Sequence, residues 1–105
     1  MFTYCVTFRI ANKTVGGKTY NERYNLLTKN ARKEDGGYWE GTTSFFLTES
    51  ALTTPELGKQ LCEGLSAKDD QFVVFDPSDM SGCYFGAVDN LDVLGSFFSS
   101  LMKLP

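Results

Sequence analysis

Residues 2–10 read FTYCVTFRI and alternate between two kinds of side chain. The large apolar members, which share one face of an extended chain, are Phe2, Tyr4, Val6, Phe8 and Ile10. The small or polar members, which share the other face, are Thr3, Cys5, Thr7 and Arg9. Aromatic and β-branched residues at a period of two predict a β-strand with one face on a hydrophobic core.

A helix is expected after the glycine-containing loop at residues 14–18. Thr19 and Glu22 have the spacing of a capping box, in which each side chain satisfies a free backbone N–H of the first turn. The residues expected to face the sheet are Tyr20, Tyr24, Leu27 and Ala31. The residues expected to face solvent are Arg23, Lys29, Asn30 and Lys33. Asp35 and the two glycines that follow it are expected to end the helix.

The middle of the chain predicts two further elements. Residues 38–48 alternate again, and Gly41 indicates either a kink or a division into two short strands of a hairpin. Thr54 and Pro55 then resemble an N-cap residue followed by proline in the first helical turn. We therefore expect a second helix that starts at Thr54.

The last third contains one strong and two weaker signals. Residues 72–75, FVVF, predict a central strand that is buried on both faces. Residues 83–88 indicate a short edge strand, and a terminal helix is expected from Leu91, with Leu101 on its apolar face. The order of elements predicts one domain over residues 1–105. Its expected fold is an α+β, ferredoxin-like sandwich, with an antiparallel sheet, two helices on one face and a short C-terminal helix.

Charge divides the chain into a basic and an acidic part. Residues 1–33 hold seven basic side chains and one acid, a balance of +6, whereas residues 34–105 hold three basic side chains and twelve acids, a balance of −9. A basic segment can mark a nucleic-acid surface, or the two parts can meet within the fold or across a dimer. The candidate nucleic-acid contacts are Arg9, Lys13, Lys18, Arg23 and Lys29.

Composition excludes several kinds of chemistry. Apolar residues make up 42% of the chain, enough for a core, which argues against disorder. The absence of histidine removes histidine-based triads and histidine-ligated zinc. Three cysteines without a C-x-x-C pair indicate neither a zinc site nor a disulfide framework. Lacking a signal-peptide pattern and a long apolar stretch, the chain is expected to be cytoplasmic, without a membrane contact and without a cofactor.

Two motifs resemble binding sites without matching them fully. Residues 16–19, GGKT, and residues 72–76, FVVFD, imitate the two signatures of a nucleotide hydrolase, but Asn12 stands where the first signature requires glycine. Anion binding at the N-terminus of the helix after Thr19 remains an alternative. Four acids near one ambiguous segment suggest either a magnesium site or, more often, turns and helix caps: Asp76, Asp79, Asp89 and Asp92.

Five segments taken in order carry a resemblance to known proteins. They are FTYCVTFRI at 2–10, the helix with Leu26 and Leu27, Trp39 with TTSFFL at 42–47, the TPEL helix at 54–57, and DDQFVVF at 69–75. This series resembles the small ferredoxin-fold proteins of the CRISPR-associated Cas-two and virulence-associated protein D families. The resemblance covers residues 2–76.

The resemblance implies a homodimer joined through its sheets, with nucleic acid as the usual partner. Some family members cleave RNA or DNA with a divalent metal held by an aspartate at the end of the first strand. Arg9 stands at the matching position, and arginine neither ligates magnesium nor acts as a base at neutral pH. Arg9 is then either a phosphate contact or a solvent-facing charge.

We therefore expect a non-catalytic, dimeric, Cas-two-like protein that associates with RNA or DNA through its basic N-terminal third. Its overall pI of about 4.8 favours an alternative, a protein-binding accessory or inhibitor module whose acidic surface engages a basic protein partner. A metal-dependent nuclease that uses Asp76 and Asp79 is a third, less favoured hypothesis.

Overall fold

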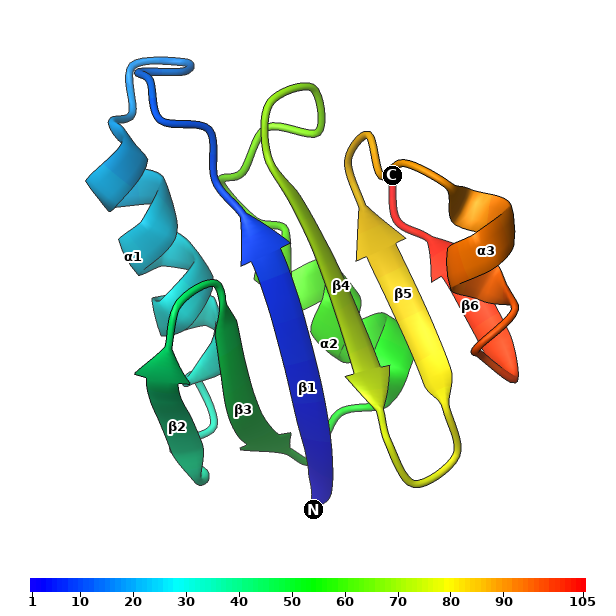
Figure 1. Cartoon of the computed structure of the whole chain (residues 1–105). Helices are drawn as coiled ribbons and strands as arrows, with labels where there is room; N and C mark the ends of the chain where they lie inside the picture. Colours follow the sequence, from blue (N-terminus) through cyan, green and yellow to red (C-terminus); the bar gives the residue numbers. More distant parts are fainter.

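A computed structural model describes residues 1–105 as six strands in one mixed sheet and three helices. The elements are β1 (Phe2–Arg9), α1 (Tyr20–Ala31), β2 (Tyr38–Thr42), β3 (Phe45–Ser50), α2 (Thr54–Leu61), β4 (Gln71–Asp76), β5 (Ser81–Phe85), α3 (Leu91–Gly95) and β6 (Ser100–Lys103). The strand order across the sheet is β2-β3-β1-β4-β5-β6 (Figure 1). The predicted α+β class is therefore confirmed.

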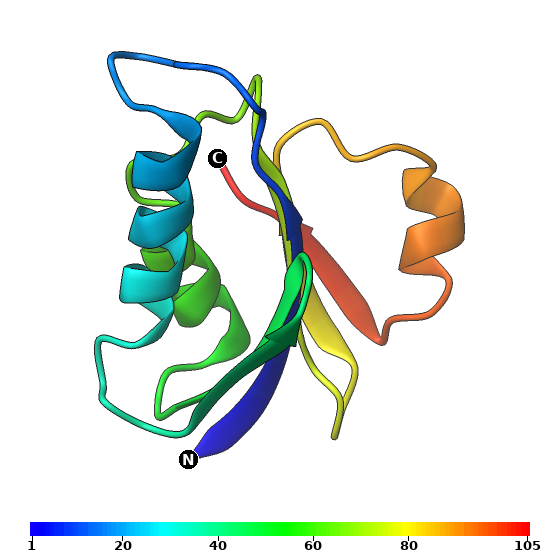
Figure 2. The same cartoon turned by 60° about the vertical axis from the view of Figure 1, so that its left-hand side comes forward.

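The helices cover the two faces of the sheet unequally. Helices α1 and α2 lie side by side on one face, and the short α3 lies on the opposite face (Figure 2). The main core is between the sheet and the first two helices, where Val6, Leu27, Phe46, Leu57 and Val74 are fully buried. No helix has both the length and the apolar character to cross a bilayer.

Strand β1 lies near the centre of the sheet and pairs with two neighbours. It runs antiparallel to both β3 and β4, so that Cys5 lies opposite Leu47 on one side and Phe75 on the other. The predicted alternation is confirmed along most of the strand, because Tyr4, Val6 and Phe8 are all buried toward the helices. Phe2, at the exposed end of the strand, is 46% accessible.

Both helices begin with the expected kind of cap, although the N-cap of the second is Thr53, one residue before the expected Thr54. The Thr19 N–H donates to the Glu22 carboxylate over 2.9 Å, and the Glu22 N–H donates to the Thr19 hydroxyl over 3.1 Å. The N-cap of α2 is Thr53, whose N–H donates to Glu56 over 2.9 Å. Thr54 is instead buried, with its hydroxyl 2.7 Å from that of Ser81, because only Thr53 has capping-box spacing to a glutamate.

The expectation that Arg23 and Asn30 face solvent is wrong. Both side chains are buried, Arg23 because the 11–18 loop and Asp70 close over it, and Asn30 because α1 packs against α2 as well as against the sheet. The Asn30 side-chain amide donates to the Glu63 carbonyl over 3.0 Å, and the Gln60 amide donates back to the Asn30 carbonyl over 2.7 Å. The sequence prediction assumed that α1 packs through one apolar stripe only. A helix that is also covered on a second side buries polar residues that such a prediction places in solvent.

The C-terminal region differs from the sequence prediction. The last helix ends at Gly95, and residues 100–103 form β6, which pairs with β5 in parallel. Strand β5 is therefore internal rather than an edge strand, and the sheet is mixed rather than antiparallel. Short apolar runs satisfy helical and strand periods equally well. Leu104, which is buried beside Gly58 and Cys83, anchors this end of the chain on the helix side of the sheet.

Candidate functional site

The five basic residues selected from the sequence do not share one surface. Arg9 is exposed on the sheet face that points away from α1 and α2. Lys13 lies in the loop before α1 and forms an ion pair with Asp69, at 2.9 Å. Arg23 is 1% accessible and offers no free group to nucleic acid. Only Lys18 and Lys29 are brought together, in one hollow on the outer side of α1.

Arg23 is the centre of a buried clamp. Its guanidinium donates from Nε to Asp70 Oδ2 over 3.0 Å and from Nη2 to Asp70 Oδ1 over 3.3 Å. The remaining guanidinium N–H groups donate to the carbonyl oxygens of Ala11 (2.6 Å), Lys13 (2.8 Å) and Lys18 (2.7 Å). The Arg23 side chain therefore fastens the 11–18 loop to α1, which is a structural role.

Asp70 completes this clamp from the other side. Its carboxylate also accepts from the N–H groups of Ala11 and Ser66, each over 3.0 Å. No buried side-chain nitrogen or oxygen atom in the chain lacks a hydrogen-bond partner. A fully satisfied buried ion pair of this kind leaves no acid or base for chemistry.

The outer side of α1 and the residues just beyond its ends carry a cluster of basic side chains. Lys18 and Lys29 line a hollow with Glu22, and Lys29 continues into a second hollow with Arg32 and Lys33. We call Lys18, Lys29, Arg32 and Lys33 the cationic face of α1. Lys33 also lies 3.3 Å from Glu63, in an exposed pair. The sequence signal for Arg32 and Lys33 was their spacing of three and four residues from Lys29, which places them on one side of a helix.

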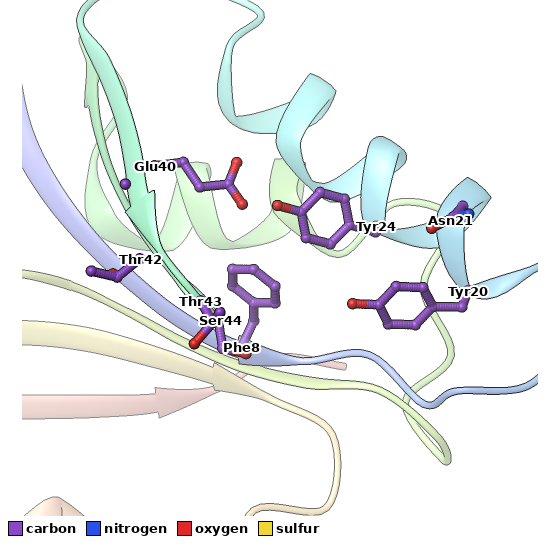
Figure 3. Close-up of a pocket in the computed structure, with 9 residues that line it drawn as sticks. Phe8, Tyr20, Asn21, Tyr24, Glu40, Thr42, Thr43 and Ser44 are labelled. Carbon is purple, nitrogen blue, oxygen red and sulfur yellow. The ribbon is translucent and has the colours of Figure 1, made fainter.

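A cleft of about 610 Å³ opens between the start of α1 and the turn that joins β2 to β3 (Figure 3). Its walls are the aromatic rings of Phe8, Tyr20 and Tyr24, the carboxylate of Glu40, and polar groups from Asn21 and the 42–44 turn. The two tyrosine rings stack with centroids 6.1 Å apart, and Phe8 contacts Tyr24 edge-on at 5.7 Å. Neither lysine nor arginine lines this cleft.

Glu40 is the one acid of the cleft, and sequence analysis did not select it. Its carboxylate accepts a hydrogen bond of 2.7 Å from the Tyr38 hydroxyl. Burial raises the pKa of Glu40 above its ordinary value, because water solvates the charged form less well there. The available signal was its position between Trp39 and Gly41, which places Glu40 on the helix side of its strand.

The glycine loop does not form a phosphate cradle. Val15 and Lys18 exchange two backbone hydrogen bonds of 2.9 and 3.0 Å around Gly16 and Gly17, both of which have positive φ. The result is a tight two-residue turn. At the start of α1 the Glu22 carboxylate bonds the N-cap, so that this helix end already holds a negative charge.

The acidic residues after β4 belong to a turn. The buried Asp76 carboxylate accepts from the N–H and hydroxyl of Ser78, at 2.8 and 2.7 Å. Asp79 accepts from the Ser81 N–H over 2.8 Å, and this bond lowers the pKa of Asp79. No group of three or more histidine, cysteine, aspartate or glutamate side chains is gathered as metal ligands would be. These contacts favour the turn interpretation over a magnesium site.

The three cysteines do not have the surroundings of nucleophiles. Burial raises the pKa of Cys5, Cys62 and Cys83, and Asp76 raises that of Cys5 further. A thiol with a raised pKa carries little thiolate at neutral pH.

The sheet face opposite α1 and α2 carries one apolar row that is only partly covered. One row of side chains crosses it through Trp39, Leu47, Cys5 and Phe75, which lie opposite one another in successive strands. Phe98, which follows α3, packs on Phe75 with ring centroids 5.5 Å apart and covers that end of the row. Trp39, at the other end, is 50% exposed. We call Trp39, Leu47 and Cys5 the open sheet face.

No protein-family model, curated protein or solved structure matched the chain when it was compared with each. The resemblance to the Cas-two group therefore stays a prediction from the sequence.

Proposed function

We propose that the chain is a non-catalytic, homodimeric protein that associates with RNA or DNA through the cationic face of α1. The observation that carries this proposal is the gathering of four basic side chains in two adjoining hollows on the outer side of α1, with Lys29 in the helix and the other three just beyond its ends. Sequence-independent binding of nucleic acid requires basic groups that reach several phosphates at once. The cationic face extends from Lys18, before the first turn of α1, to Lys33, after its last turn. A helix of 12 residues is roughly 18 Å long, which is enough to pass several phosphates.

We also infer a ferredoxin-like core over residues 2–76. The strand order β2-β3-β1-β4, with antiparallel neighbours and both long helices on one face, supports this inference. Strand β5, helix α3 and strand β6 are then an addition to this core. The Cas-two-like character of the chain is part of the same proposal. Arg9 departs from the aspartate with which some family members hold a metal, and this departure supports the non-catalytic part of the proposal.

Reversing charge on α1 should abolish most nucleic-acid binding. For the variant Lys29→Glu/Lys33→Glu we expect at least about a tenfold loss of affinity for short RNA or DNA at about 50 mM salt, and a salt dependence reduced by about two phosphate contacts. The measurement is fluorescence anisotropy with a labelled oligonucleotide at about 50 and 200 mM salt.

The matched control is Lys68→Glu/Lys103→Glu, which makes the same change in net charge at exposed positions outside α1. This control should lose much less affinity. Equal losses in the two variants would assign the effect to overall charge, and no binding by the unchanged protein at about 50 mM salt would remove the proposal.

The proposed dimer is formed by the open sheet face. A row of apolar side chains that is only partly covered, and is half exposed at Trp39, favours burial against a second copy, and a two-fold axis brings the same patch to itself. We expect Leu47→Lys to produce a monomer in light scattering, because the new charge would be buried in the interface. Val93→Lys, which changes a 56% exposed apolar residue of α3, should stay dimeric. A monomeric unchanged protein would contradict this part of the proposal.

A further inference from the structure

The cleft between α1 and the β2–β3 turn collects hydrogen-bond acceptors. The Glu40 carboxylate and the hydroxyl groups of Tyr20 and Tyr24 point toward the same space (Figure 3). The polar residues of the 42–44 turn line the same cleft. A carboxylate only accepts hydrogen bonds, and a hydroxyl group can accept them. The surroundings therefore fit a group that is rich in donors.

The charge on Glu40 has no cationic partner within the protein. Its one side-chain hydrogen bond comes from the neutral hydroxyl of Tyr38. Arg32, a member of the cationic face, lies over the Tyr38 ring, with its guanidinium 4.7 Å from the ring centroid, and does not line the cleft. A half-buried carboxylate without a counter-charge is stabilised by any cation that enters beside it.

The aromatic walls favour the same class of ligand. The faces of tyrosine and phenylalanine rings are negative and attract ammonium or guanidinium groups, while their area also packs against an aliphatic stem. Tyr20 and Tyr24 present such rings on successive turns of α1, and Phe8 lies beneath them. A phosphate would instead meet the Glu40 carboxylate, so that this cleft is distinct from the nucleic-acid surface.

We propose that this cleft binds the side chain of an arginine or lysine from a protein partner. The cation would lie against Glu40, and its aliphatic stem would pack on the tyrosine rings. A volume of about 610 Å³ also leaves room for residues that flank the bound side chain. Strand β2 is an edge strand of the sheet, so that an extended segment can approach along its free side. The site would give the acidic, protein-binding alternative a definite contact, and it does not depend on nucleic-acid binding.

The test uses two short peptides of equal shape. One has a central arginine between glycines, and the other has citrulline, which keeps the size of the side chain and removes its charge. Two-dimensional NMR of the isotopically labelled protein should show arginine-dependent shifts confined to Phe8 and residues 20–24 and 40–44. We expect the arginine peptide to bind at least about tenfold more tightly than the citrulline peptide, a difference of roughly 1.4 kcal/mol.

Glu40→Gln is the decisive variant, because the amide keeps its shape and can still accept from Tyr38. It should remove the preference for arginine over citrulline. Asp92→Asn removes one exposed charge on α3, on the far side of the sheet, and should keep the full preference.

The outcomes separate the possible ligands. Equal binding of the two peptides, or shifts outside the cleft, would overturn the proposal. Spermidine serves as the free-amine comparison, and tighter binding of spermidine than of the arginine peptide at the same residues would assign the cleft to small amines instead of a protein. Loss of nucleic-acid binding in the α1 variants would leave this result unchanged, because Glu40 and the tyrosines lie outside the cationic face.

Discussion

Replacing Arg23 by methionine should lower the free energy of unfolding by about 3–5 kcal/mol, the usual cost of removing one partner from a buried ion pair. Asp70 would keep its two backbone donors but lose both contacts from the guanidinium. The carbonyl groups of the 11–18 loop would lose their donors at the same time. Chemical unfolding followed by tryptophan fluorescence measures the change.

The neighbouring pair of Lys13 and Asp69 supplies the control. It joins the same two loops over 2.9 Å, but the Lys13 side chain is 61% exposed. We therefore expect Lys13→Met to cost about 0–1 kcal/mol, as solvent screens an exposed pair. A double variant, Arg23→Met/Asp70→Asn, should lose less free energy of unfolding than the sum of the losses in the two single variants. Each single variant leaves one buried charge without its partner, whereas the double variant leaves none. If Arg23→Met cost no more than Lys13→Met, the clamp would not be a main source of stability.

Local patterns of the sequence predicted the elements that have strong periodicity. The alternation in residues 2–10 gave both the strand and the face that is buried. The capping box at Thr19 placed the start of α1 correctly, because its two hydrogen bonds join residues only three apart. Information of this kind is contained in short windows of the chain.

Contacts between distant segments could not be predicted in this way. Arg23 has the appearance of an exposed helical residue until Asp70, 47 residues away, is brought beside it. Strand β6 depends on pairing with β5, and the four residues of β6 have too weak a pattern to distinguish a strand from a helix.

The candidate sites also differ in how far the sequence alone predicted them. Lys18 and Lys29 were selected from charge alone, and the fold places both of them in one hollow on the outer side of α1. Glu40 was not selected, since its significance comes from Tyr20 and Tyr24, which α1 brings over β2 only in the folded chain. The sequence around a single glutamate in a strand does not indicate which side chains of a distant helix will lie beside it.

Replacing Gly86 by alanine should be destabilising by about 2–4 kcal/mol. Gly86 follows β5 with a φ of +87°, a conformation that costs a residue with a Cβ atom roughly 1–2 kcal/mol. The added Cβ would also overlap the carbonyl oxygen of Asp70 and come within 3.2 Å of the Gln71 Cα atom. Both obstacles are backbone, so that neither can turn away as a flexible side chain would, and the chain near the Arg23–Asp70 clamp would have to move.

Gly95→Ala is the matched control for this prediction. Gly95 is the last residue of α3, and a Cβ atom there meets nothing within 4 Å. Alanine should therefore be neutral or should stabilise the fold by up to about 1 kcal/mol, through the smaller freedom of the unfolded chain. Thermal or chemical unfolding of the two variants compares the same chemical change in two surroundings. A similar stability for both would mean that the loop after β5 moves away from Asp70 at little cost, and that the clamp does not depend on this close approach.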